Sequence, residues 1–423
     1  MSRSGGKSFS HLVIAAMSEN WKRTTNLFLA SQAVSLFGST LVQYAIVWHI
    51  TLKTQSGVMM MVSILCGFLP TFFLSPFAGV WADRYNRKTL IILSDSVIAL
   101  ATLILAILFL NGYSAFWLLF VMSAIRAFGA GVQMPAIGAI LPQLVPEDKL
   151  TKVNAINSSI QSVVTLLSPM LSGVLLATSP IEIVFFIDVV TAAIAVSILL
   201  FFLHIPTHAK ALGKQTLSYF DDMREGLVYI RNHAFIKILF IFNAIFFMFI
   251  APLAFLTPLQ VTRTFGSDVW RLTAVEVSFS AGMMIGGGIM AAWGGFGNKM
   301  HTMVLSTLAI GVCTVALGIV PVFWFYLLLM VIVGIVLPVF NVPFTVLLQQ
   351  KVEGDFLGRV FGVLGMIVSA VMPLAMLVYG PVADYIKIEW LLIGTGLLIF
   401  AEGFFMLGSK VLIEAGKPVL KPE

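Results

Sequence analysis

Residues Gly79–Lys88 read Gly-Val-Trp-Ala-Asp-Arg-Tyr-Asn-Arg-Lys and lie between two long apolar runs, 57–82 and 89–110. Charges this dense, between two candidate membrane spans, predict a short loop at the membrane surface. Basic loops of membrane proteins are retained in the cytoplasm, so the same stretch predicts which surface it occupies.

The composition is that of a membrane protein. Of 423 residues, 59% are hydrophobic and only 10% are charged, whereas soluble domains carry about 25% charged residues. The net charge of +6 falls in short clusters between apolar runs, which argues against a nucleic-acid partner. Cys66 and Cys313 lie inside apolar runs without disulfide or metal spacing.

Twelve apolar runs are long enough to cross a bilayer, and helices are the spanning elements expected for them. The predicted spans are 25–48, 57–82, 89–110, 115–141, 151–177, 181–204, 236–261, 270–294, 300–320, 322–347, 357–381 and 390–410.

The distribution of Lys and Arg predicts the orientation. With a cytoplasmic N-terminus, twenty of these residues fall inside, four fall outside, and Arg126 lies within a span. We therefore expect a multi-pass protein of the inner (plasma) membrane with both termini in the cytoplasm. The polar N-terminus followed by a long apolar run predicts no cleaved leader.

The spans divide into two sets of six. We expect an N-terminal half at 1–205, a cytoplasmic linker at 206–235 and a C-terminal half at 236–423, with an amphipathic helix over Ser218–Arg231. A shift of 207 positions pairs Gln143 with Gln350 and Asp148 with Asp355, before the fifth and eleventh spans. A repeat of six spans is a transporter architecture, with the substrate site between the halves.

Several motifs then indicate a family. Gly79-x-x-x-Asp83-Arg84-x-x-Arg87-Lys88 matches the signature between the second and third helices of the major facilitator superfamily, with Asn86 where Gly is usual. Arg126-x-x-Gly129-x-Gly131 resembles the fourth-helix motif of proton-driven exporters, and Ser168-Pro169-x-x-Ser172-Gly173 resembles the antiporter motif of the fifth helix, with Ser in place of Gly twice. Three further elements resemble the macrolide-efflux branch of the drug:proton antiporters more narrowly: Gln32-Ala-Val-Ser-Leu, Leu144-Val-Pro-Glu and Leu357-Gly-Arg-Val-Phe.

The resemblance covers nearly the whole chain and implies an all-α fold of twelve transmembrane helices in two six-helix halves. It also implies that the eighth span packs on the fifth and the eleventh on the second. The function it implies is export of hydrophobic drugs, most closely macrolides, driven by proton influx.

Four ionisable residues lie inside apolar runs and are the candidates for proton and substrate coupling: Arg126, Asp188, Glu276 and Asp95. A charge at the bilayer centre costs roughly 3 kcal/mol or more, so a functional role is the default interpretation. We expect Asp188 and Glu276 to include the proton-binding group; snorkelling to a helix end is the alternative for each. Asp95 could instead pair with loop cations, and Glu402 is expected to be structural or to face lipid.

Polar residues repeat on one face of two predicted helices. Gln32, Ser35 and Gln43 do so in the first span, and Gln161 and Thr165 in the fifth. Such a face lines a water-filled pathway or makes hydrogen bonds to neighbouring helices.

The motif stretch also predicts a conformational latch made of Gly79, Asp83, Arg84, Arg87 and Lys88. Asp83 is expected to face the N-terminus of the eleventh span, and the cations to pair with Glu353 or Asp355. The equivalent loop at 294–299 lacks Asp and Arg, so the latch is predicted on one side only.

No enzyme activity, cofactor or metal is expected, because the chain lacks a phosphate-binding loop and metal-ligand spacing. The expected partners are a small hydrophobic drug, protons and lipids. Two alternatives stay open: export of another amphipathic metabolite, such as a siderophore or lipid, and a subunit that partners an ATP-driven pump.

Overall fold

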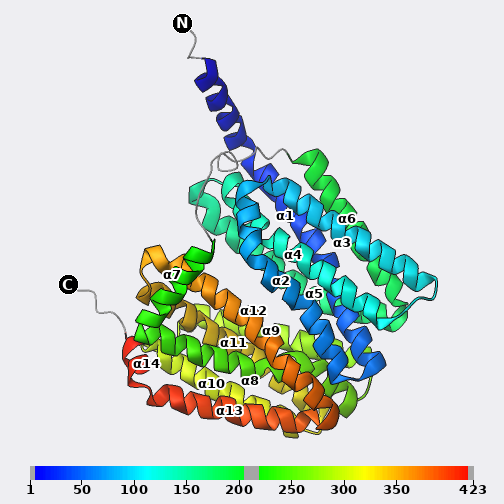
Figure 1. The fold of residues 1–423 in the computed structure, drawn as a ribbon, viewed down its shortest axis with the longest axis vertical. Helices are drawn as coiled ribbons and strands as arrows, with labels where there is room; N and C mark the ends of the chain where they lie inside the picture. The colour runs from blue at the N-terminus through cyan, green and yellow to red at the C-terminus, as the bar shows by residue number, and fades with distance from the viewer. Residues whose placement is uncertain (1–4, 204–218, 418–423) are drawn as a thin grey trace. The chain divides into compact units, whose positions relative to one another are not determined.

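The computed structural model describes residues 5–203 and 219–417, which form helices and no strand (Figure 1). The first helices are α1 (Gly5–Thr54), α2 (Gly57–Arg84), α3 (Arg87–Leu110), α4 (Phe116–Leu144), the 3-10 turn η1 (Glu147–Lys149), α5 (Leu150–Thr178), α6 (Ile181–Ser197) and the π-helical η2 (Ile198–Phe202). They are followed by α7 (Tyr219–Asn232), α8 (Ala234–Thr264), α9 (Val269–Trp293), α10 (Lys299–Ile319), α11 (Phe323–Lys351), α12 (Gly354–Tyr385), α13 (Ile388–Gly408) and α14 (Lys410–Ala415).

Twelve helices in the described part of the chain are long and apolar enough to cross a membrane. They are α1 to α6 and α8 to α13, one for each predicted run. The predicted all-α fold with twelve spans is therefore confirmed, and this is a multi-pass membrane protein.

The charged stretch at 79–88 is mostly helical, which corrects the predicted loop. The last turns of α2 continue to Arg84 and α3 begins at Arg87, so only Tyr85 and Asn86 separate them. The Asn86 side chain accepts hydrogen bonds from the backbone N–H groups of Lys88 and Thr89, at 3.0 and 3.4 Å. Asn86 thus caps α3, and its backbone (φ −64°) does not require the Gly that is usual there.

Two compact units make up the chain. The first contains residues 1–44, 73–175 and 179–215, and the second contains 45–72, 176–178 and 216–423. The end of α1 and the first part of α2 therefore group with the helices of the second unit.

Within the first unit, α3 packs against both α4 and α6. Gly129 of α4 allows a close approach to α3, because a Cβ there would lie 2.6 Å from Cδ1 of Ile98. This packing brings the polar residues of α3, α4 and α6 together.

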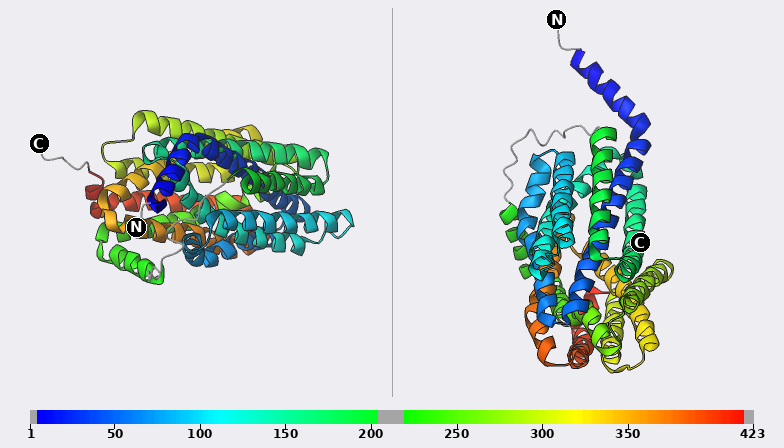
Figure 2. Two further views of the ribbon diagram at one scale, coloured as in Figure 1. Left: turned by 90° about the horizontal axis from the view of Figure 1, so that it is seen from above. Right: turned by 90° about the vertical axis from the view of Figure 1, so that its right-hand side faces the viewer.

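Within the second unit, α10 packs along α13 and α9 along α11 (Figures 1 and 2). A Cβ on Gly282 of α9 would overlap the Val331 carbonyl oxygen of α11, so these backbones nearly touch. The amphipathic helix predicted over Ser218–Arg231 is α7, although Ser218 lies outside the described residues. It packs on α12, where the Tyr229 and Phe356 rings stack with centroids 4.5 Å apart.

The packing of the eleventh span on the second occurs at one end of these helices. A Cβ on Gly57, the first residue of α2, would overlap the Gly380 carbonyl oxygen of α12. In the first half of α12, no atom of a described residue lies within 4 Å of a Cβ built on Gly358, Gly362 or Gly365.

Candidate functional site

Arg126 lies near the middle of α4, ten residues from its start, or about 15 Å along the helix axis at 1.5 Å per residue. Only 6% of its surface is exposed. Its Nη1 forms an ion pair with Oδ2 of Asp188 at 2.5 Å and donates to Oγ1 of Thr102 at 3.2 Å. Its Nη2 donates to the Ser39 carbonyl at 2.8 Å. One guanidinium thus joins α1, α3 and α6 to α4.

Asp188 of α6 is 1% exposed and accepts a second hydrogen bond from the Thr102 hydroxyl, at 3.1 Å. Gly38 of α1 leaves room beside this carboxylate, because a Cβ there would overlap Oγ1 of Thr191 and lie 3.0 Å from Oδ1 of Asp188. Snorkelling does not describe Asp188, since the buried Arg126 satisfies its charge.

Asp95 of α3 is the third charged member of the cluster and is 2% exposed. Its Oδ1 accepts hydrogen bonds from the Ser35 hydroxyl at 2.8 Å and the Gln133 amide at 2.9 Å. Its Oδ2 is buried without a hydrogen-bond partner among the described residues, and the carboxyl is within electrostatic reach of Asp188 and Arg126. The loop cations suggested as an alternative partner are not among these contacts.

This arrangement has a direct chemical consequence. The cluster contains two carboxyls and one guanidinium, so it carries an excess negative charge when both carboxyls are ionised. A charge that is buried away from water without a partner is costly, and the binding of one proton to a carboxylate of the cluster removes that excess charge. The first unit therefore contains a buried site whose charge balances with one proton.

The predicted cavity residues fall into two groups. Gln32 and Ser35 of α1 are buried, and Ser35 belongs to the Asp95 network. Gln43 of α1 and Gln161 and Thr165 of α5 are exposed on their helices. On α5 the polar face becomes buried further along, at Ser168 and Ser172, which belong to the predicted antiporter motif.

The two carboxyl groups that the sequence places well inside apolar runs of the second half, Glu276 and Glu402, lie in the second unit. Glu276 of α9 is partly buried. Glu402 of α13 is 4% exposed, so of the two expected roles the lipid-facing one does not fit and the structural one stays open. The apolar composition of α13 all around its axis did not show which face is buried. Among the described residues, no group of three or more His, Cys, Asp or Glu is placed to hold a metal ion.

The latch residues are described in part. The side chains of Gly79, Asp83 and Asp355 lie outside the described residues, and Arg84 is exposed. Arg87 donates to the carbonyls of Ala82 and Ala139, and Nζ of Lys88 donates to the Leu203 carbonyl at 2.7 Å. These contacts tie the start of α3 to α2, α4 and η2 within the first unit.

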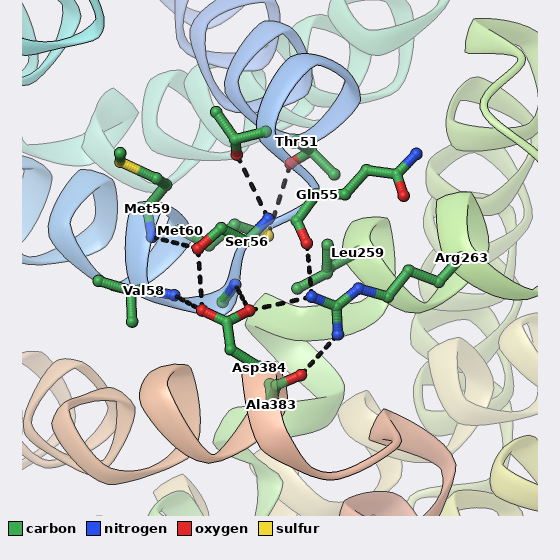
Figure 3. Close-up of polar contacts among 12 residues, drawn as sticks. Thr51, Gln55, Ser56, Val58, Met59, Met60, Leu259, Arg263, Ala383 and Asp384 are labelled. Atoms are coloured by element: carbon green, nitrogen blue, oxygen red, sulfur yellow. Dashed lines mark hydrogen bonds and ion pairs between the residues drawn. The ribbon is translucent and has the colours of Figure 1, made fainter.

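A second cluster of contacts, which the sequence did not predict, lies where α2 begins (Figure 3). The Asp384 carboxylate of α12 accepts hydrogen bonds from the backbone N–H groups of Gly57 (2.6 Å) and Val58 (3.0 Å) and from the Ser56 hydroxyl (2.9 Å). The first N–H groups of a helix have no partner within the helix, so an anion there is well placed. We call Asp384, Arg263 and the Gln55–Val58 segment the carboxylate clasp.

Arg263, near the end of α8, completes the clasp. Its Nη2 forms an ion pair with Asp384 at 3.0 Å and donates to the Gln55 carbonyl, and its Nη1 donates to the Ala383 carbonyl (Figure 3). Gln55 has a φ of +46°, a left-handed conformation that is costly for a residue other than Gly. The clasp therefore holds a tight turn in place as well as capping a helix.

Twelve helices long enough to span a membrane, with charged residues buried inside the bundle of the first unit, are typical of a transport protein. A family model, Major Facilitator Superfamily, matches residues 28–376, and the chain belongs to this superfamily of transporters.

Its similar relatives include macrolide efflux protein A of Streptococcus pyogenes, 30% identical over 383 residues that cover 90% of this chain and 94% of the relative. Macrolide efflux protein A of Enterococcus faecalis is 29% identical over 314 residues, covering 74% of this chain and 97% of the relative. Among solved structures, a mutant of the nucleoside transporter NupG has a TM-score of 0.71 at 14% identity, covering 92% of this chain and 99% of that one. That likeness concerns the fold.

Proposed function

We propose that this transporter exports hydrophobic antibiotics, most closely macrolides, from the cytoplasm or inner leaflet in exchange for protons. The observation that carries the proton coupling is the buried cluster of Arg126, Asp188 and Asp95, in which two carboxyls share one guanidinium. The similarity to macrolide efflux proteins supports the substrate class.

In the proposed cycle, a proton competes with the Arg126 guanidinium for the carboxylate of Asp188. When Asp188 binds a proton, it becomes neutral and its attraction for Arg126 falls. The guanidinium keeps its charge and its contacts with Thr102 and the Ser39 carbonyl, and it turns toward Asp95, whose Oδ2 has no hydrogen-bond partner among the described residues. The proton thereby changes contacts that join α1, α3, α4 and α6. Glu276 is proposed to attract a cationic drug amine from the other half.

The halves proposed to move are 1–205 and 236–423, joined by the linker at 206–235, with both termini in the cytoplasm of a plasma-membrane protein. In this orientation the carboxylate clasp is at the outer end and the predicted Asp83 latch at the inner end. The predicted latch repeats the design of the clasp, in which a carboxylate in the last turn of one helix caps the N-terminus of another. We propose that the clasp closes the outer side and that Asp83, against the start of α12, closes the inner side.

Drug accumulation in cells tests this function. Cells that produce the protein should accumulate less radiolabelled erythromycin than cells without it, and a proton uncoupler should abolish the difference. Asp188→Asn should abolish it as well, while Asp148→Asn, on an exposed surface residue, should not.

Two outcomes would contradict the proposal. Efflux that survives the uncoupler would favour a partnership with an ATP-driven pump. Unchanged macrolide accumulation, together with export of a siderophore or lipid, would retain the transporter class and reject the substrate.

A further inference from the structure

Glu402 lies on α13, six residues before its end, which is about 9 Å along the axis at 1.5 Å per residue. The residue is only 4% exposed, and neither of its carboxyl oxygens has a hydrogen-bond partner within the described part of the chain. No contact described above for Arg126, Asp188 or Asp95 involves it.

The surroundings of Glu402 are apolar. It lines a small pocket with the aromatic residues Phe246, Phe340 and Phe344 and with Met406, contributed by α8, α11 and α13. Phe246 and Phe340 stack with their ring centroids 4.8 Å apart, which closes one wall. Among the described residues that line this pocket, none is a cation that would balance an ionised carboxylate.

One further polar group lines the same pocket. Asn243 of α8 is 4% exposed, and its Nδ2 is also buried without a hydrogen-bond partner among the described residues. A carboxyl and an amide that both lack hydrogen-bond partners among the described residues thus line one otherwise apolar pocket, and a movement that brings them together would form a hydrogen bond between them.

The charged residues of the neighbouring helices lie near helix ends and are not among the residues that line the pocket. Apart from Glu402, every charged residue of α8, α10, α11 and α13, and the His of α10, lies within four residues of a helix end: Lys237, Arg263, Lys299, His301, Lys351 and Glu389. Among the described residues that line the pocket, Glu402 is the one with an ionisable side chain.

We propose that Glu402 is a proton-binding site of the second unit, and that the Asn243 amide is the donor of a hydrogen bond to the carboxylate when the proton leaves. On ionisation the carboxylic O–H bond breaks, the proton passes to water, and the carboxylate accepts a hydrogen bond from Nδ2 of Asn243. An ionised Glu402 without that donor would be a buried charge without compensation, which is costly in an apolar setting.

Proton binding at Glu402 does not depend on what the protein transports, whereas a role in coupling rests on the proposed function. In that role Glu402 adds a second titrating site to the Arg126 cluster. In the predicted orientation it lies toward the cytoplasmic end of α13, where a proton taken up from outside is released.

Infrared difference spectroscopy of the purified protein tests proton binding directly. The native protein at neutral pH should show the carbonyl stretch of a buried protonated carboxylic acid, and Glu402→Gln should lose it. Glu414→Gln, an exposed carboxyl on α14, should retain it. Asn243→Leu should keep the band to higher pH, because the ionised form has lost its donor. A band at neutral pH that is the same in Glu402→Gln and the native protein would overturn the proposal, and Glu402→Met repeats the test if the Gln variant fails to fold.

A transport measurement separates this proposal from the proposed function. In proteoliposomes, a pH gradient should accelerate erythromycin movement by the native protein. Glu402→Gln should move erythromycin at the same rate with and without the gradient, and it should still exchange drug for drug. If the native protein moves no drug, the proposed function is rejected. Proton binding at Glu402 is then judged from the infrared result alone. Native coupling that is unchanged in Glu402→Gln would reject the coupling role of Glu402.

Discussion

Removing the Asp384 carboxylate tests the carboxylate clasp. Asp384→Ala leaves the N–H groups of Gly57 and Val58 without their acceptor and breaks the ion pair with Arg263. The side chains of Asp384 and Arg263 are 25% and 30% exposed, so water partly replaces what is lost.

The cost follows from these contacts. Loss of a helix-capping side chain costs about 0.5–2 kcal/mol, and a partly exposed ion pair contributes about 0.2–1 kcal/mol. Together they amount to about 1–3 kcal/mol, which is about a 5- to 150-fold change in a conformational equilibrium. The cost of Asp384→Asn should lie at the low end of this range, because the amide oxygen still caps the helix while the charge is lost.

Spin-label distances measure this shift. Both native cysteines are replaced, and labels are attached at Lys53→Cys and Lys387→Cys, two exposed positions near the ends of α1 and α13. The population with a long label-to-label distance should rise by the predicted factor in Asp384→Ala. The control is Asp268→Ala, because Asp268 precedes α9 but makes no side-chain capping hydrogen bond. A distance distribution in Asp384→Ala that matches the native protein would refute the clasp.

Three further changes follow from the packing and the buried contacts. Arg126→Lys should fold but lose most drug-coupled proton flux, because one ammonium does not reproduce contacts that the planar guanidinium makes to three oxygens; flux near the native level in proteoliposomes would contradict this. Gly380→Leu should separate α12 from α2, since its Cβ would lie 2.5 Å from Cβ of Met61, and cross-linking between these helices should fall. Tyr326→Phe should lower the melting temperature, because the Tyr326 hydroxyl donates a hydrogen bond to the buried Gln260 amide oxygen at 2.9 Å. Its loss should reduce the free energy of unfolding by about 1–3 kcal/mol. An unchanged melting temperature would show that this hydrogen bond contributes nothing to stability.

The spans could be predicted from the sequence because the bilayer requires about 20 apolar residues for each crossing. The intramembrane charges were recognisable for the same reason: Arg126 and Asp188 stand out in runs that otherwise avoid charge. Their pairing was not recognisable, because it joins positions 62 residues apart and depends on how α3 packs between α4 and α6.

The clasp could not be predicted from the sequence, because it joins residues that are far apart in the chain and because charged residues are common at helix ends. Asp384 and Gly57 are 327 positions apart, and a carboxylate at the end of a span is usually solvated. One signal was available in the sequence. The two-residue turn at Gln55 and Ser56 is followed by α2, whose first turn contains no acidic residue to cap it.

Glu402 shows the limit of composition on a buried helix. Because α13 is apolar on every side, periodicity does not distinguish its lipid face from its packed face. The close approaches of Gly311 and Gly396, where α10 meets α13, identify the packed face only once the structure is known.

Proton and drug fluxes measured together in proteoliposomes of the purified protein test the central claim most directly. With a pH gradient imposed and erythromycin as the only drug, the native protein should move protons and drug in opposite directions, and each flux should require the other. Asp188→Asn should abolish the coupled proton flux, and the exposed Asp148→Asn should leave it at the native level. Drug movement that ignores the gradient, or coupled fluxes that persist in Asp188→Asn, would contradict the account.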